Sequence, residues 1–306
     1  MHLTLRQLQV FEATARLLSF RKAAEALHLS QPAVSMQIKQ LEENVGLPLF
    51  EKLGKQIYLT EAGREIYHYS RAIGQLLNEA DEVIQGLKGA HRGRLTIAVA
   101  STANYFVPTL LGTFHARFPG VTVTLDVTNR KALLEHLAEN EVDLVVMGQP
   151  PEGADVEAGA FMENPLVVIA PPEHPLAQQK DIPLKRLEEE VFLTRERGSG
   201  TRSAIERFFA QHGVQLNTGM EVASNEAIKQ SVQAGLGLGL LSRDTLEMEL
   251  ALGKLVVLDV EDFPILRHWY VMYRKGKRLS AVAQAFRQFL LDEANDALRI
   301  APALST

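Results

Sequence analysis

The sequence contains no cysteine among its 306 residues, which excludes disulfide bonds and metal sites built on thiolates. It has no apolar run of the ~18 residues that a membrane-spanning helix needs. Its first residues lack the basic head and apolar core of a secretory signal. Its nine histidines are never paired at the i, i+3 or i+4 spacing of a metal-binding helix. We therefore expect a cytoplasmic protein with no membrane contact, no metal and no bound cofactor.

The length and the distribution of charge suggest more than one domain. A chain of 306 residues exceeds the roughly 150 residues of one average domain. Residues 1–60 carry seven lysines and arginines against five acidic residues, whereas residues 95–306 carry 20 against 27. The net charge of −5 therefore combines a slightly basic N-terminal segment with an acidic remainder. Charge alone does not identify a partner, but it directs attention to the N-terminal segment.

Two short helical patterns meet at the tight connection "HLS" within residues 20–50. In the second, Ser30 can cap the helix and Pro32 lies in the first turn, where a missing N–H is harmless. Four apolar residues recur at helical spacing and predict its buried stripe: Val34, Ile38, Leu41 and Val45. The pattern is that of a helix-turn-helix, although an ordinary helical hairpin would share it.

The stretch "AAEALHLSQPAVSMQIKQLEENVGLPLF", followed by "YLTEAG", closely resembles the N-terminal signature of LysR-type transcriptional regulators. The resemblance covers residues 3–63 almost without a gap, and it implies a winged helix-turn-helix domain over residues 1–59 that binds double-stranded DNA. Glutamine can pair with an adenine edge, proline and methionine can contact thymine methyl groups, and lysine can contact phosphates. The DNA-binding residues that we expect are Ser30, Gln31, Pro32, Ser35, Met36, Lys39, Lys52 and Lys55.

Residues 60–88 form one long helical pattern with Thr60 as its expected N-cap. Apolar residues recur at heptad spacing and suggest a helix–helix seam, although a helix packed on its own domain would give a similar pattern. The resemblance favours the seam, because the family uses this helix as an antiparallel dimer contact and is commonly tetrameric, as a dimer of dimers. The expected dimerisation residues are Ile66, Ile73, Leu77 and Ile84. The glycine-rich segment 89–94 would then act as a hinge.

From residue 95 onward, short apolar strands alternate with helical stretches, as in an α/β fold with parallel sheets. The resemblance implies an effector-binding domain over residues 95–306, similar to a periplasmic binding protein and made of two subdomains. The first would contain residues 95–163 and 269–306, and the second residues 166–266.

Three loops that follow strands and open helices are candidate anion sites, because the first N–H groups of a helix lack partners. They are "STANY" (101–105), "TNRK" (128–131) and "RERGSGTRS" (195–203). A solvated basic loop with a capped helix is the alternative for the third. In the resembling family these loops face the cleft between subdomains, which implies a small, anionic effector. The expected contacts are Ser101, Thr102, Asn104, Asn129, Arg130, Ser199, Thr201 and Arg202.

Other motifs argue against an enzyme. "GLGLG" (235–239) follows a helix and precedes a strand, the reverse of a dinucleotide fingerprint, and predicts a helix stop with close packing. "RGSGT" lacks both the spacing of a hydrolase elbow and the lysine of a P-loop. A free-standing solute-binding protein would have no DNA-binding head. Within the family, "TNRKALLEHLAENEVDLVVMGQPP", "RERGSGTR" and "SNEAIKQSVQAGLGLGLLS" resemble the Calvin-cycle carbon-fixation (CbbR-type) regulators. Regulators of sulfur or nitrogen metabolism share parts of these motifs and stay open as an alternative.

Overall fold

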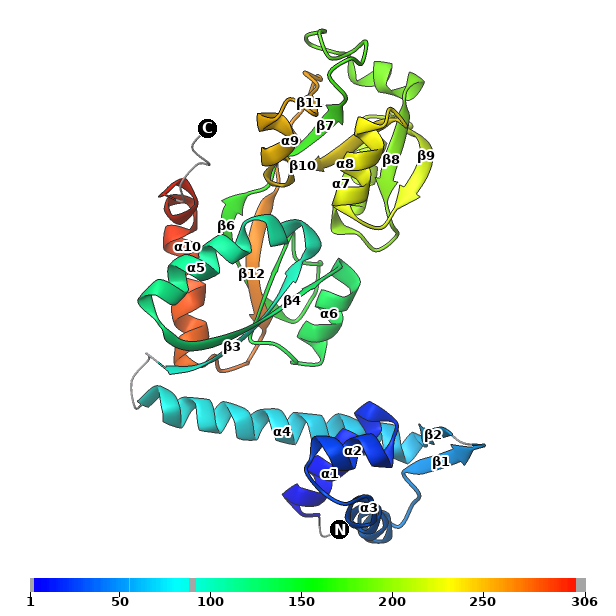
Figure 1. Cartoon of the computed structure of the whole chain (residues 1–306), viewed down its shortest axis with the longest axis vertical. Coiled ribbons are helices and arrows are strands. Elements are labelled where there is room, and N and C mark those ends of the chain that lie inside the picture. The colour runs from blue at the N-terminus through cyan, green and yellow to red at the C-terminus, as the bar shows by residue number, and fades with distance from the viewer. Residues whose placement is uncertain (1–2, 55, 88–91, 301–306) are drawn as a thin grey trace. The chain divides into compact units, whose positions relative to one another are not determined.

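The computed structural model describes residues 3–54, 56–87 and 92–300 (Figure 1), and the chain divides into two compact units between Asp81 and Glu82. The predicted fold class is confirmed, because a winged helix-turn-helix and a long helix precede two α/β subdomains. In the described part of the chain, no helix is long and apolar enough to cross a membrane.

The first unit is a three-helix head with a two-stranded wing. Its elements, including the long helix that continues past Asp81, are α1 (Leu5–Leu17), α2 (Phe20–Ala26), α3 (Gln31–Val45), β1 (Phe50–Leu53), β2 (Gln56–Leu59) and α4 (Glu61–Leu87). Strands β1 and β2 pair antiparallel. The core of the head lies between the three helices, where Phe11, Val34 and Leu41 are fully buried.

The wing is joined to α3 and to the start of α4 by specific contacts. The Glu42 carboxylate accepts hydrogen bonds from the backbone N–H groups of Leu49, at 2.8 Å, and Phe50, at 3.3 Å. Thr60 caps α4 as predicted, because its hydroxyl accepts from the Gly63 N–H at 3.0 Å. A Cβ on Gly63 would lie 2.1 Å from the Leu49 carbonyl oxygen, so this position requires glycine. These contacts explain why the motif "LTEAG" follows the wing.

The second unit begins with a five-stranded sheet in the order β4-β3-β5-β12-β6. Its strands are β3 (Arg92–Ala100), β4 (Gly120–Thr128), β5 (Leu144–Met147), β6 (Val156–Glu163) and β12 (His268–Arg274). Helices α5 (Val107–Arg117) and α10 (Ala281–Ile300) cover one face, where Leu110, Phe114 and Phe286 are buried. Helix α6 (Arg130–Ala138) covers the other face through Leu133 and Leu137.

A second five-stranded sheet has the order β11-β7-β10-β8-β9. Its strands are β7 (Leu166–Ala170), β8 (Val191–Arg195), β9 (Asn217–Val222), β10 (Leu238–Ser242) and β11 (Val256–Val257). Helix α7 (Gly200–Gln211) packs on one face through Ile205 and Phe209. Helix α8 (Asn225–Gln233) packs on the other through Ile228 and Val232. Each sheet and its helices form one subdomain, and the two lie next to each other in Figure 1.

The chain crosses between the subdomains twice, and the two crossovers pair with each other. The Asn164 N–H donates to the Arg267 carbonyl at 2.8 Å, and the Leu166 N–H donates to the Ile265 carbonyl at 3.0 Å. The expectation of parallel sheets is only half right, since β12 runs antiparallel to β5 and β6, and β7 runs antiparallel to β10 and β11. The antiparallel strands are those next to the crossovers, where the chain leaves one sheet and enters the other: β6 and β7 flank the first crossover, and β12 follows the second. Strand β6 was missed because half of its eight residues are exposed and only Phe161 is buried.

Candidate functional site

Helix α3 presents an exposed polar face opposite its buried stripe. The Ser30 hydroxyl accepts from the Ala33 N–H at 3.3 Å, which caps the helix as predicted. The side chains of Gln31, Ser35 and Lys39 are exposed, and Met36 is 54% exposed although it is apolar. An exposed methionine beside amide and hydroxyl groups matches the chemistry of base edges and thymine methyl groups.

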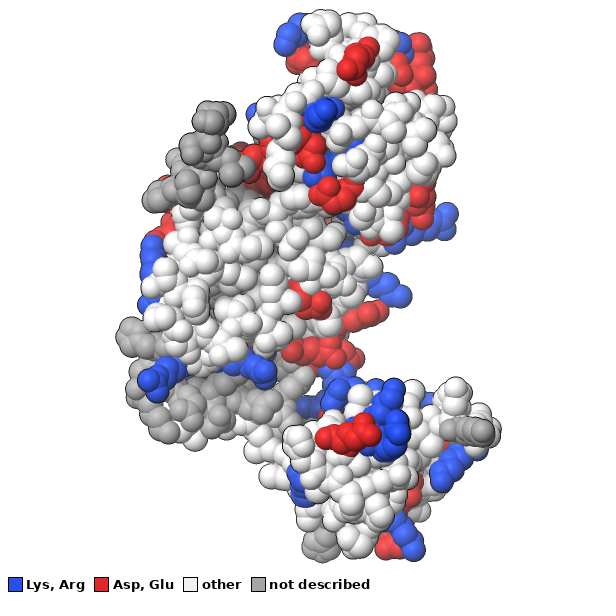
Figure 2. Space-filling view, viewed as in Figure 1, with Lys and Arg blue, Asp and Glu red and all other residues white. Residues whose placement is uncertain are grey.

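The basic side chains of the head are spread over the helix and the wing. Lys39 lies 3.8 Å from Glu43 at the surface of α3, and Lys52 is exposed on β1. Lys55 lies outside the described residues. Figure 2 shows basic and acidic side chains side by side on this unit, whereas acidic side chains gather over α6. The head is therefore only weakly basic. A nucleic-acid interface is indicated instead by its helix-turn-helix shape and by the exposed polar groups of α3.

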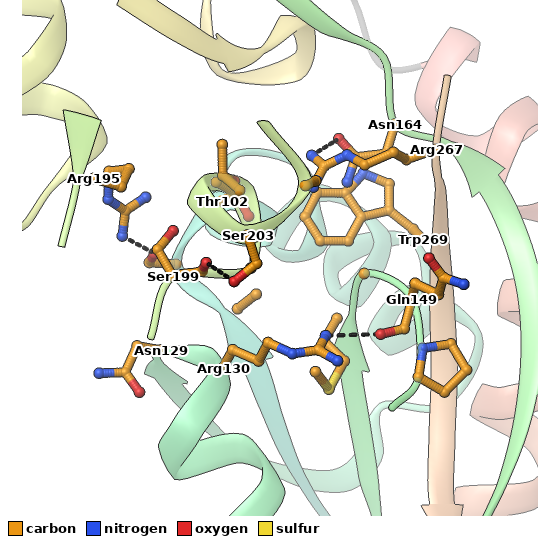
Figure 3. A pocket seen from close by; sticks show the side chains of 18 of the residues that line it. Thr102, Asn129, Arg130, Gln149, Asn164, Arg195, Ser199, Ser203, Arg267 and Trp269 are labelled. Carbon is orange, nitrogen blue, oxygen red and sulfur yellow. Dashed lines mark hydrogen bonds between the residues drawn. The ribbon is translucent and has the colours of Figure 1, made fainter. Parts of the chain in front are cut away.

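A cavity of about 460 Å³ lies between the two subdomains of the second unit. Segments from both sheets and from both crossovers form its wall (Figure 3). The residues that line it include Ser101, Thr102, Asn129, Arg130, Gln149, Glu152, Asn164, Arg195, Ser199, Gly200, Thr201, Ser203, Arg207, Arg267 and Trp269. In the close-up, Arg130 and Arg267 approach from different sides, with Ser199 and Ser203 between them.

Two helices begin at the wall of this cavity. Asn129 caps α6 by accepting from the Ala132 N–H at 3.1 Å, and Ser199 caps α7 by accepting from the Arg202 N–H at 3.5 Å. Both caps hold helix N-termini, with their free N–H groups, at the cavity. Gly200 is the first residue of α7, and a Cβ there would lie 3.4 Å from the Arg130 side chain. The Arg130 side chain therefore lies next to the first residue of α7.

Three arginines in the wall have no carboxylate within 4 Å among the residues that the structure describes. Arg130 donates to the Gln149 carbonyl at 2.7 Å, and Arg207 approaches the Gln149 side chain at 3.4 Å. Burial lowers the pKa of Arg130, and the nearby Arg207 charge adds to this effect. Burial also lowers the pKa of Arg267 to about 10, against the opposing effect of the Asp244 charge. Arg130 and Arg267 are partly desolvated and Arg207 is exposed, and none of the three has a carboxylate partner among the described residues, so an anion in the cavity would stabilise these charges.

Arg195 differs from these three because its charge is already neutralised. Its guanidinium, which is 4% exposed, donates to both oxygens of the Glu196 carboxylate, at 2.8 and 3.0 Å. It also donates to the Asn225 side chain and, across the cavity, to the Ser101 hydroxyl at 3.3 Å. Arg195 therefore links the two subdomains rather than offering a free charge.

Trp269 makes a second link between the subdomains. Its indole Nε1–H donates to the Asp244 carboxylate at 3.0 Å, and Asp244 lies in the 3₁₀ turn η3 (Arg243–Thr245) that follows β10. Burial raises the pKa of Asp244, although the hydrogen bond from Trp269 opposes this. Trp269 is 1% exposed and is the single tryptophan of the chain.

Both units match known protein families. Residues 5–64 match the bacterial regulatory helix-turn-helix of the lysR family, and residues 88–295 match the LysR substrate binding domain. The chain belongs to the LysR family. It is a DNA-binding transcriptional regulator, as the sequence resemblance implied.

Several curated relatives of this LysR-type regulator span almost its whole length. A RuBisCO operon transcriptional regulator of Allochromatium vinosum is 60% identical over 294 residues, which is 96% of this chain and 97% of the relative. The transcriptional activator CmpR of Synechocystis is 49% identical, over 95% of this chain and 96% of the relative. The regulatory domain of Synechocystis CcmR, solved in complex with 2-PG, is 43% identical with a TM-score of 0.64, over 69% of this chain and all of that domain. These relatives are regulators and not enzymes.

The structure brings most of the sequence-predicted effector residues of this LysR-type protein together. Six of them line the cavity: Ser101, Thr102, Asn129, Arg130, Ser199 and Thr201. Asn104 is exposed and does not line it. Arg202 does not line it either, because Glu206 at 2.7 Å and Glu221 hold its guanidinium and raise its pKa.

The sequence reasoning missed the arginines and the tryptophan that complete the cavity. Arg207 had a usable signal, since Gly200, Ser203 and Arg207 recur at helical spacing and share one face of α7. Arg267 and Trp269 had none, because they follow the second crossover, which local patterns do not reveal. Within the described residues, no group of three or more His, Cys, Asp or Glu side chains could hold a metal ion.

The proposed dimer seam on α4 is divided between two environments. Ile66 and Ile73 are partly buried and pack against the core of their own head. Leu77 is 43% exposed and Ile84 is 53% exposed. Helix α4 therefore combines the two alternatives that the sequence left open, because the first half of its apolar face packs on the head and the second half of the same face is open to solvent.

Proposed function

We propose that this LysR-type regulator controls genes of carbon fixation and responds to a small anionic metabolite in the cavity between its subdomains. The near full-length identity to a RuBisCO operon regulator supports the choice of genes over sulfur or nitrogen metabolism. Double-stranded DNA as a partner implies that the protein works in the cytoplasm, where bacterial chromosomes lie. We further propose a homodimer formed through α4, two copies of which associate as a tetramer, so that paired heads meet a pseudo-palindromic site.

One observation carries the effector proposal: Arg130, Arg207 and Arg267 face one cavity without carboxylate partners among the described residues. A ligand with phosphate or carboxylate groups would supply the missing charge and accept bidentate hydrogen bonds. Glu152 also lines the cavity, but it is exposed and, among the described residues, makes no ion pair with these arginines. The solved complex of the CcmR regulatory domain makes 2-PG the first ligand to test.

Calorimetric titration of the full-length chain with 2-PG tests the effector proposal. Arg207→Gln should weaken binding by about 10- to 100-fold, because a hydrogen-bonded charge contact is worth roughly 1.5–3 kcal/mol. Arg202→Gln is the matched control on the same helix, and it should leave the affinity within about twofold. Equal losses in the two variants, or binding of uncharged ligands only, would contradict an anion site in this cavity.

The target genes are tested separately. Sequencing the genomic fragments that the full-length protein retains should return sites beside carbon-fixation genes. Fragments beside sulfur or nitrogen genes would instead support the alternative within the same family.

A further inference from the structure

The short 3₁₀ helix η1 (Ser101–Tyr105) has different tasks at its two ends. Ser101 and Thr102 line the effector cavity. Tyr105, at the other end, extends its side chain to the second subdomain, where its hydroxyl donates to the Glu226 carboxylate of α8 at 2.5 Å. A single five-residue element thus contacts both the cavity and the second subdomain.

The Tyr105–Glu226 contact rests on a buried ammonium group. Lys229 is 3% exposed, and its Nζ lies 2.8 Å from both the Glu226 and the Glu249 carboxylates. It also donates to the Thr245 carbonyl at 3.0 Å. The same Nζ lies 4.9 Å from the centre of the Tyr105 ring, which is within the range of a cation–π interaction. Lys229 therefore attracts the ring of Tyr105 as well as the carboxylate that its hydroxyl meets.

The protonation states suit a hydrogen bond from the tyrosine to the carboxylate. Burial raises the pKa of Tyr105, and the Glu226 contact raises it further, so the hydroxyl keeps its proton. Partial burial opposes ionisation of Glu226, but hydrogen bonds from Lys229 and Tyr105 outweigh it and lower the pKa of the carboxyl. At neutral pH the donor is therefore protonated and the acceptor is charged.

The other end of η1 is attached to the same helix. Arg195 joins the Ser101 hydroxyl, at 3.3 Å, to the Asn225 side chain, and Asn225 is the neighbour of Glu226 on α8. Both ends of η1, in the first subdomain, are thus attached to the first turn of α8, in the second. Ser101 is attached through Arg195, and Tyr105 is attached directly. The Glu226 side chain is 59% exposed, so this contact can open without uncovering a buried core.

We propose that Tyr105, Glu226 and Lys229 are positioning residues for the effector site, which hold the two subdomains closed around the cavity. Resting on the proposed function, this closure sets how tightly a ligand that touches both subdomains is held. A ligand that needs the closed arrangement binds more weakly in proportion to the fraction of molecules that are open. Loss of the Tyr105 hydroxyl therefore lowers effector affinity without removing any group from the cavity.

The test uses Trp269 as a reporter, because it is buried in the cavity wall and bound across the subdomains to Asp244. In the full-length chain without ligand, Tyr105→Phe should raise acrylamide quenching of Trp269 and shift its emission to longer wavelength. Tyr273→Phe is the matched control, because the Tyr273 hydroxyl also donates to a carboxylate, that of Glu157, but within one sheet of the first subdomain. This variant should leave the Trp269 signal unchanged.

The ligand arm then measures 2-PG affinity in the same variants. Tyr105→Phe should weaken binding by about two- to tenfold, the range of one hydrogen bond, with a melting temperature close to that of Tyr273→Phe. If Tyr105→Phe does not fold, Glu226→Ala, at an exposed helix position, takes its place in both arms. Unchanged quenching, or equal changes in Tyr105→Phe and Tyr273→Phe, would overturn the proposal. If the wild type binds neither 2-PG nor another phosphate or carboxylate metabolite, the effector proposal fails, and the quenching arm still decides this one.

Discussion

At the scale of single residues, Gln31 and Lys39 lie on the same exposed face of α3 but offer different chemistry to DNA. An amide can make a bidentate contact to an adenine edge, whereas an ammonium contacts phosphates of any sequence. Gln31→Ala should therefore cost about 1–3 kcal/mol on the specific site and little on random DNA. Fluorescence anisotropy on both duplexes measures the difference.

Lys39→Ala is the companion variant on the same helix. It should weaken specific and random binding alike and reduce the slope of log affinity against log salt by about one. Equal losses on both duplexes for Gln31→Ala would show that α3 does not read the bases where we place it.

Asp244 gives a prediction in pH. Because burial raises its folded pKa above the ordinary value of about 3.9, the folded chain holds this proton more tightly than the unfolded chain. The contribution of Asp244 to stability therefore falls as pH rises from about 3.9 through the raised value. Asp244→Asn keeps an acceptor for Trp269 and removes the charge. Its stability relative to the wild type, followed in urea through Trp269 fluorescence, should increase over this window and then level off. A difference that is constant with pH would contradict a raised pKa.

At the scale of elements, α4 separates two effects that the sequence pattern merged. Leu77→Glu places a charge on the exposed apolar side of the helix, and a dimer seam there would bury it unpaired, at a cost of several kcal/mol. Sedimentation of this variant should show loss of the dimer, together with weak operator binding. An unchanged oligomer with unchanged operator affinity would exclude this face as the seam.

Ile73→Ala is the counterpart one turn earlier on the same face of α4. Because Ile73 packs against the core of the head, its truncation should lower the stability of the head by about 1–3 kcal/mol, less than for a fully buried isoleucine. Thermal unfolding measures this loss, and the variant should still dimerise.

The sequence predicts these elements well where the signal is local. Ser30 and Thr60 cap helices as expected, because a cap depends on residues only three positions apart. Strand β6 escaped prediction because half of its residues are exposed and it lacks a continuous apolar run. Gly63 shows the intermediate case: its position in a motif was evident, but the reason for it, the carbonyl of Leu49, lies fourteen residues away in the chain.

At the scale of the whole molecule, the cavity could be predicted only in part. Helix N-termini pointed to Asn129 and Ser199, because such sites are visible in the sequence. Arg267 could not be found, since it reaches the cavity only through a second crossover that no local pattern encodes. Arg202 was expected in the cavity, but its guanidinium is held outside it by Glu206 and Glu221. The sequence does not reveal this competition, because Glu221 lies on a different element.

The coupling between effector and DNA is also a property of the whole chain. If the ligand changes operator affinity by some factor, operator DNA must change ligand affinity by the same factor. Titrating 2-PG with and without a saturating operator duplex, and the duplex with and without 2-PG, should give equal factors. If both factors equal one, 2-PG does not change operator affinity, and the cavity does not regulate DNA binding.

The paired crossovers have a mechanical consequence. The two crossover segments, with Asn164 on one and Arg267 on the other, are hydrogen-bonded side by side. This pairing favours rotation of the two subdomains about a single axis. An anionic group held by Arg267 would lie beside that axis, where rotation would displace it least, so it would remain bound over a range of opening angles. Groups held farther out, on α6 and α7, have a longer lever arm, and they select the angle. One end of a ligand would thus fix where it binds, and the other end would determine the signal it gives.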